Sequence, residues 1–260
     1  MPVTYSSYLK LEELLRLQQP VSDGPEHDET LFIIIHQVYE LWFKEMIHEL
    51  DYLIALLGRE DTPRAQHTLK RILTILKVVV AQIDVLETMT PLEFLTFRER
   101  LESGSGFQSF QFRELEFILG GKNPAALDRY PVGSDARQRL ERRLREPTLW
   151  DAFLRFLAAK GLSIPAQALK RDVTKPVESM PALHPFLIGL YRGNAVLATL
   201  CERLVDLDEG LQEWRYRHVK MVQRTIGTKQ GTGGSAGAAY LMTTLNKPYF
   251  PDLWEIRAEL

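Results

Sequence analysis

The strongest constraint on this fold is a helical pattern that runs through residues 28–57 without a proline or glycine. An α-helix of that length is about 45 Å long at 1.5 Å per residue. Its apolar residues cover more than half of the helix circumference, which is typical of a helix that is buried on most sides. We therefore expect a central helix around which the rest of the chain packs.

Two further helices are expected directly after the first. Thr62 is a favourable N-cap and Pro63 follows at the first helical position, which predicts a long helix to about residue 89. Thr90 repeats this signal, and Glu93 stands at the capping-box position. The second signal predicts a short helix to about residue 101.

The remainder of the chain also has helical periodicity, and no segment shows the alternation typical of strands. The pattern predicts an all-α fold: a helical bundle with two long antiparallel helical pairs and smaller helices around them. No linker divides the chain, so we expect a single domain over residues 1–260. The remaining predicted segments are a helix ending at Gly120-Gly121, short helical pieces in 122–180, long helices at 184–206 and 209–226, a glycine-rich loop at 227–237, and a helix resuming near Ala238.

Composition excludes several classes of protein. The 32 basic and 34 acidic side chains leave a net charge of −2, which provides no field suited to nucleic acid or an anionic membrane. Cys201 is the only cysteine, so an internal disulfide framework is excluded. The longest apolar run, at 31–35, is far too short to cross a bilayer, and the N-terminus lacks a secretory pattern. We expect a cytoplasmic protein without nucleic-acid or membrane partners.

Four of the six histidines are interpreted as structural or solvated. His27, His67 and His184 lie in a polar loop, on a polar stretch and at a helix start, respectively. His48 follows Glu45 with the Glu-x-x-His spacing of di-iron bundles, but such a site needs a second copy of the motif, and the chain has none.

The other two histidines stand among apolar residues at helical spacing. His36 shares a helix face with Phe32, so its ring either bonds a partner within the core or faces a cavity. His218 shares a face with Trp214 and Val222, and cationic side chains are close in the sequence. An imidazole on an apolar surface near cations suits haem binding, although a solvated histidine on a basic helix remains the alternative.

Four segments resemble tryptophan 2,3-dioxygenases, in the order and spacing of that family. They are YLKLEELLRLQQPVS at 8–22, HDETLFIIIHQVYELWFKEMIHELD at 27–51, FRERLESGSGFQSFQFRELE at 97–116, and WRYRHVKMVQRTIGTKQGTGGSAGAAYL at 214–241. The resemblance implies a haem pocket between the long helices, with one haem b per subunit. It also implies a homotetramer, built as a dimer of dimers, in which residues 1–20 form an arm that reaches a neighbouring subunit.

The resemblance also assigns roles to individual residues. His218 would be the axial ligand of the haem iron, and His36 would be the catalytic histidine beside the substrate indole. Arg98 would bind the substrate carboxylate and Thr232 its amino-acid end, while Phe94 stands where some bacterial members carry a tyrosine. The remaining substrate-binding residues implied by the resemblance are Phe32, Ile33, Ile34 and Ile35, together with Tyr5, Tyr8 and Leu9 from the arm.

The reaction implied by the resemblance belongs to tryptophan catabolism, in the kynurenine pathway. Both atoms of O2 would add across the indole C2=C3 bond of L-tryptophan to give N-formyl-L-kynurenine. A related indoleamine dioxygenase is an alternative, but Arg98 and Thr232 together favour strict recognition of the amino-acid end. A non-catalytic haem-binding or tryptophan-binding protein is a second alternative, which the presence of nearly all the family positions disfavours.

Overall fold

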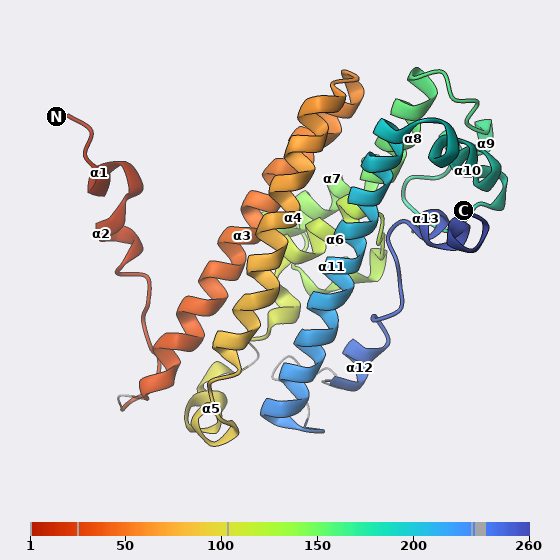
Figure 1. The fold of residues 1–260 in the computed structure, drawn as a ribbon. Helices are drawn as coiled ribbons and strands as arrows, with labels where there is room; N and C mark the ends of the chain where they lie inside the picture. The colour runs from red at the N-terminus through yellow and green to blue at the C-terminus, as the bar shows by residue number, and fades with distance from the viewer. Residues whose placement is uncertain (1, 25, 103, 230, 232–237) are drawn as a thin grey trace.

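The structure is a computed structural model that describes residues 2–24, 26–102, 104–229, 231 and 238–260. These residues form helices and loops without any strand, which confirms the predicted all-α fold. Three long helices, α3 (His27–Gly58), α4 (Thr62–Leu86) and α11 (Ala195–Ile226), run side by side through the molecule (Figure 1). In this part of the chain, no helix is both long enough and apolar enough to traverse a lipid bilayer.

Shorter helices surround the three long ones. In Figure 1, α8, α10 and α13 gather towards one end of α11, whereas α5 and α12 lie towards its other end. The short α-helices are α1 (Tyr5–Leu9), α2 (Leu11–Leu14), α5 (Pro91–Arg98), α6 (Phe110–Leu119), α7 (Asp135–Arg145), α8 (Leu149–Ala159), α9 (Ala166–Leu169), α10 (His184–Gly193), α12 (Ala238–Met242) and α13 (Pro251–Glu255). The 3-10 helices are η1 (Glu99–Leu101), η2 (Gly106–Gln108), η3 (Pro124–Arg129), η4 (Pro181–Leu183) and η5 (Ile256–Glu259).

Helix α3 confirms the predicted central element. It is 32 residues long and begins and ends within one residue of the predicted bounds. Its buried side chains recur at helical spacing, and Met46, Leu50 and Leu53 are almost fully excluded from solvent. These residues belong to one continuous apolar core that also includes side chains of α4, α8 and α11. This continuous core favours the single domain over 1–260, which stays a prediction.

The capping signals were largely correct. Thr90 and Glu93 form the predicted capping box at the start of α5, with both reciprocal hydrogen bonds present. Gly120 ends α6 in the left-handed region at φ 118°, where a side chain would be strained. The N-cap of α4 was placed one residue too late, because the carboxylate of Asp61 accepts the hydrogen bond of Arg64 N and Thr62 is already helical.

The predicted boundary between the two helices in 184–226 was wrong. Helix α10 ends at Gly193. Helix α11 then begins at Ala195 and runs without a break through 207–210. Asn194 ends the first helix and caps the second, because its side chain accepts the hydrogen bond of Leu197 N at 3.0 Å. Gly210 lies inside α11 against α4, where an added Cβ would come within 2.6 Å of a Leu76 methyl carbon. This glycine therefore permits close approach of two helices rather than ending one.

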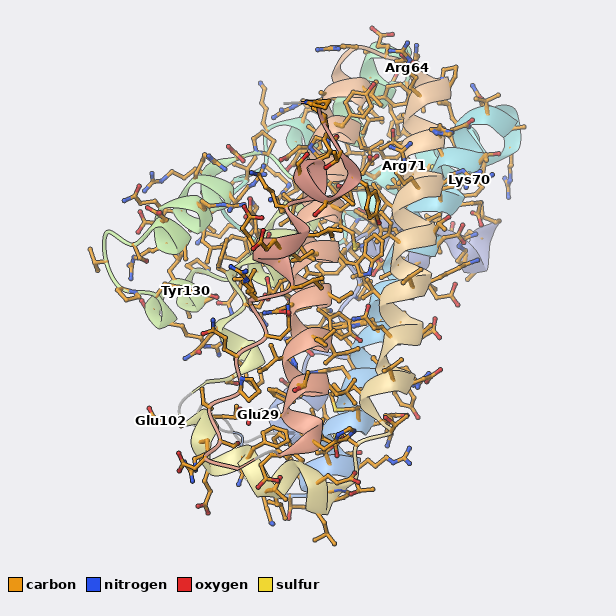
Figure 2. The ribbon with its side chains drawn as sticks, turned by 90° about the vertical axis from the view of Figure 1, so that its left-hand side faces the viewer. Glu29, Arg64, Lys70, Arg71, Glu102 and Tyr130 are labelled. Atoms are coloured by element: carbon orange, nitrogen blue, oxygen red, sulfur yellow. The ribbon has the colours of Figure 1, made fainter. Side chains whose placement is uncertain are left out.

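A smaller cluster stands beside the main core. Phe117, Leu127, Tyr130 and Leu140 pack together where α6 and η3 meet α7. Figure 2 shows Tyr130 on this lateral part of the molecule, and Arg71 along α4. The helices in 122–180 are all short, as predicted.

The N-terminal segment is joined to the body through residues 17–23, where Leu17 and Gln18 bond Gln37, and Asp23 pairs with Arg100. The buried carboxylate of Glu29, near the start of α3, accepts hydrogen bonds from Val21 N at 2.7 Å and Ser22 N at 3.2 Å. Figure 2 shows Glu29 at this lower end of α3. Beyond this point α1 and α2 stand apart from the other helices (Figure 1). The segment therefore packs little against its own chain.

Candidate functional site

A cavity of about 240 Å³ lies between the long helices, at the end of the molecule where α5 and α12 are located. Its wall is formed by side chains from α3, α4, α5, α6 and α11, and by residues 241–244. Both histidines that stand among apolar residues in the sequence line this cavity: His36 from α3 and His218 from α11. The structure thus brings together two imidazoles that are far apart in the sequence.

The tautomer of His36 follows from its hydrogen bond. Its Nδ1 lies 2.7 Å from the backbone carbonyl oxygen of Phe32, one helical turn earlier. A carbonyl oxygen only accepts, so Nδ1 carries the proton and donates it. Burial lowers the pKa of His36, so the ring is neutral near pH 7. A neutral ring protonated on Nδ1 has an unprotonated Nε2 that can accept a hydrogen bond.

His218 is also held in its neutral form. Burial, and to a lesser degree the neighbouring His36, lowers the pKa of His218 to about 4. Its ring stacks on that of Trp214, with the centroids 5.2 Å apart and the planes 9° from parallel. Neither ring nitrogen forms a hydrogen bond to a residue that the structure describes. A neutral imidazole with uncommitted nitrogen atoms is a suitable metal ligand.

Phe32 and Phe94 form one wall of the cavity, with Phe97 packed behind them. Phe32 lies 5.7 Å from Phe94 and 5.5 Å from Phe97, measured between ring centroids, and these two rings of α5 are 5.5 Å apart. Arg98, one turn after Phe94 on α5, is half-buried and also lines the cavity. A flat apolar surface next to a guanidinium suits a ligand that combines an aromatic ring with a carboxylate.

A charged cluster stands on another side of the cavity. The Glu116 carboxylate of α6 bonds Arg215 of α11 at 2.9 Å, and Arg113 pairs with its other oxygen. Arg215 also bonds the hydroxyl of Tyr249 and the carbonyl oxygen of Thr244. Two guanidinium groups share one carboxylate, so the cluster has an excess of positive charge and can attract anionic groups.

Comparisons with known proteins agree with this geometry. The family model described as tryptophan 2,3-dioxygenase matches residues 1–163 and 179–260. A tryptophan 2,3-dioxygenase of Herpetosiphon aurantiacus is 62% identical over 99% of this chain and 98% of its own length. One from Anaeromyxobacter sp. strain K is 54% identical over 99% and 96%, and one from Nocardioides sp. is 51% identical over 99% and 95%.

The chain belongs to the tryptophan 2,3-dioxygenase family. This confirms the resemblance and the prediction of an oxidoreductase of the dioxygenase class. The family is haem-dependent, and the cavity fits such a group. The neutral imidazole of His218, whose nitrogen atoms bond no described residue, suits a ligand of the haem iron. The apolar rings suit a porphyrin face, and Arg113 and Arg215 suit anionic substituents.

The isoleucines in the predicted pocket lie away from the cavity. Ile35 is buried in the apolar core, Ile34 is 42% exposed to solvent, and Ile33 is half-buried. None of the three is part of the cavity wall. Each residue turns a helix by about 100°, so the residues between Phe32 and His36 point to other sides of α3.

Three further predicted residues, all in the N-terminal segment, do not line the cavity of this chain. Tyr5 and Tyr8 are each 76% exposed and Leu9 is 40% exposed, on the segment that stands apart from the body. None of these three side chains is part of the cavity wall. Thr232 lies outside the described residues.

The remaining histidines lie outside the site. His27, His48 and His67 are exposed, and His184 bonds the buried carboxylate of Asp252 at 3.1 Å. Across the described ranges, no three His, Cys, Asp or Glu side chains are grouped closely enough to hold a metal ion.

The sequence patterns did not indicate the charged cluster. Arg113 and Glu116 lie on a helix whose charged positions resemble any solvated surface, and the partner of Glu116 is 99 residues away. Their position inside a segment that resembles the family was the only signal.

Proposed function

We propose that this chain is a haem b-dependent dioxygenase that adds both atoms of O2 across the indole C2=C3 bond of L-tryptophan. The product is N-formyl-L-kynurenine, and the reaction belongs to the kynurenine pathway of tryptophan catabolism in the cytoplasm. The observation that carries this proposal is one cavity lined by two neutral histidines from different helices, in a chain of the tryptophan 2,3-dioxygenase family.

One haem b per subunit occupies the cavity in this proposal, with His218 as the axial ligand. The lowered pKa of His218 supports this role, because a protonated imidazole has no lone pair for iron. When bound, the haem supplies the binding and activation of dioxygen. Arg113 and Arg215 are the cationic groups available to its carboxylates.

His36 orients the substrate in this proposal. Its Nδ1 donates to the Phe32 carbonyl oxygen, so its Nε2 accepts the hydrogen bond of the indole N–H. This bond fixes the position of the indole ring in the cavity. Indole is electron-rich, so the chemistry requires no obligatory base, and His36 acts by positioning and hydrogen bonding.

The remainder of the substrate is held by an aromatic wall and polar groups. Phe32 and Phe94 flank the indole, and Arg98 forms a bidentate pair with the carboxylate. Thr232, between two glycines in the sequence, binds the amino-acid end. Phe94 maintains the aromatic wall but cannot supply the hydrogen bond of a tyrosine.

We place the N-terminal arm in the site of a second subunit. Tyr5 and Tyr8 in the arm are each 76% exposed, and burial of such apolar surface lowers the free energy of a chain in water. A homotetramer, arranged as a dimer of dimers, supplies that burial. In the assembly Tyr5, Tyr8 and Leu9 line the substrate pocket of a neighbouring copy.

The decisive experiment is an anaerobic visible spectrum of the reduced protein, recorded with and without L-tryptophan and followed by addition of oxygen. We expect the spectrum of a histidine-ligated haem, a change when L-tryptophan binds, and formation of N-formyl-L-kynurenine after oxygen is added. A purified protein that binds no haem, or a haem protein that yields no product, would contradict the proposal.

A further inference from the structure

Trp214 and His218 lie one helical turn apart on α11, with their rings almost parallel. The i, i+4 spacing places both side chains on one face of the helix. It does not make their planes parallel, because each ring can still rotate about its side-chain bonds. Other contacts must therefore fix the plane of the Trp214 ring.

Three aromatic rings from two other helices supply those contacts. The Phe112 ring of α6 lies 4.8 Å from Trp214. Two rings of α3 meet Trp214 edge-on: Tyr39 at 6.4 Å and 69°, and Phe43 at 6.2 Å and 86°. A large flat side chain that is packed on several sides has few accessible rotamers. The three rings therefore form an aromatic cage that holds the plane of the Trp214 ring in place.

The plane of the Trp214 ring matters for the orientation of the His218 imidazole. A histidine that binds a metal ordinarily donates its second ring N–H to a carboxylate or carbonyl, which fixes the ring orientation. For His218 no such partner exists in the described part of the chain. Among the described residues, the face-to-face contact with Trp214 can therefore determine the orientation of the ring.

We propose that Trp214 is a positioning residue that sets the plane of the His218 imidazole by stacking on it. The inference rests on the proposed function, in which His218 binds the haem iron. The orientation of an axial imidazole affects its orbital overlap with the iron, which is one means by which a protein tunes a haem. Tyr39 lies one turn after His36, so the same cage also links the helices that carry the two histidines.

The test compares full-length, haem-loaded wild-type protein with W214F and W214L. The proton NMR shifts of the haem methyl groups in the ferric cyanide complex report the orientation of the axial imidazole. The iron–histidine stretching frequency of the ferrous protein reports the strength of the same bond. A third measurement is the rate at which haem transfers to an excess of apomyoglobin.

We expect W214F to keep the wild-type methyl pattern, since phenylalanine retains a flat face. W214L should change the pattern, shift the iron–histidine frequency and release haem roughly tenfold faster, as is typical when the support of a metal ligand is lost. The matched control is W150L, which removes a more deeply buried tryptophan that packs on Phe153 and Phe250 outside the cavity. W150L should lower stability but leave the methyl pattern unchanged.

A wild-type methyl pattern in W214L would overturn the inference, and so would an equal change in W150L. If W214L does not fold, W214M replaces it, because methionine fills most of the volume without a flat face. A wild-type methyl pattern in W214M, or an equal change in W150L, would then overturn the inference. Failure of the proposed function is distinguishable, because the wild-type protein itself would then show no histidine-ligated haem.

Discussion

The middle of α11 and its C-terminal third differ in how their polar groups are satisfied. In the middle, Asp208 is fully buried, and one of its carboxylate oxygens accepts hydrogen bonds from Tyr249 N, Phe250 N and Trp254 Nε1 at 2.8–3.1 Å. Ten residues later, in the C-terminal third, His218 faces a cavity with no ring-nitrogen bond to any described residue. One helix therefore serves two purposes: its fully bonded middle gives stability, and its C-terminal third presents a polar group to the cavity.

The largest expected effect is at His218, in the C-terminal third of α11. H218Q should abolish haem retention and reduce dioxygenase activity by roughly 1000-fold or more, because the proposed axial ligand is removed. The free energy of unfolding of the haem-free protein at pH 7 should change little, since the His218 ring nitrogens bond no residue in the described part of the chain. Haem content, activity and urea unfolding are the measurements, with the exposed H67Q as control. An H218Q protein with normal haem content would contradict the proposal that His218 binds the haem iron.

The opposite result, a loss of stability without a direct effect on haem binding, is expected at Asp208 in the middle of α11. D208A leaves three buried donors without an acceptor, so the free energy of unfolding should fall by about 3 kcal/mol or more. Urea denaturation measures this loss. D206A is the matched control on the same helix, and because Asp206 is exposed its effect should be under about 0.5 kcal/mol. Equal effects of the two variants would show that the Asp208 bonds contribute little.

Removal of the charge at the aromatic wall should affect the substrate selectively. R98M should lower kcat/KM for L-tryptophan by about 10- to 100-fold, the range for one charged hydrogen-bonding partner. Activity on tryptamine, which lacks the carboxylate, should change little. R100M removes an exposed arginine of the same segment, paired with Asp23, and should leave both activities unchanged. A parallel loss on both substrates in R98M would argue against carboxylate recognition.

The smallest expected effect is a pH dependence of the haem-free protein. His218 has a pKa of about 4 in the fold and an ordinary value near 6.5 when unfolded, so the unfolded chain binds more protons between these values. Its contribution to stability is present above pH 6.5 and is lost as the pH falls towards 4. The lowered pKa of His36 adds a loss of the same sign.

Urea unfolding at pH 7 and pH 4.5 measures this dependence. H218Q should reduce the difference between the two pH values by about 2 kcal/mol, because glutamine does not titrate. H67Q, at an exposed position, should leave the difference unchanged. Identical differences in H218Q and wild-type protein would mean that the His218 ring is not buried as a neutral group.

Features fixed by adjacent residues were the ones that the sequence predicted well. The bounds of α3, the capping box of Thr90 and the glycine stop at Gly120 all depend on a few neighbouring residues. The break at Asn194 was missed because a capping asparagine is a weaker signal than a proline or glycine, and Gly210 is retained for its contact with α4.

The site was predictable only in part, for a related reason. Helical spacing indicated the apolar surroundings of His36 and His218, but their roles came from resemblance to the family. The pairing of Glu116 with Arg215 and the cage around Trp214 depend on tertiary contacts across three helices. A single sequence has no local signal for contacts of that kind.

The hydrogen bond from His36 to the Phe32 carbonyl oxygen has a consequence for mutagenesis. The acceptor is a main-chain atom of α3, so every amino acid at position 32 that keeps the helix supplies the same oxygen. A scan of single substitutions would find that His36 is required and would find no second residue that selects its protonated nitrogen. Such a scan does not detect the group that selects the tautomer, because side-chain substitution leaves the peptide carbonyl in place.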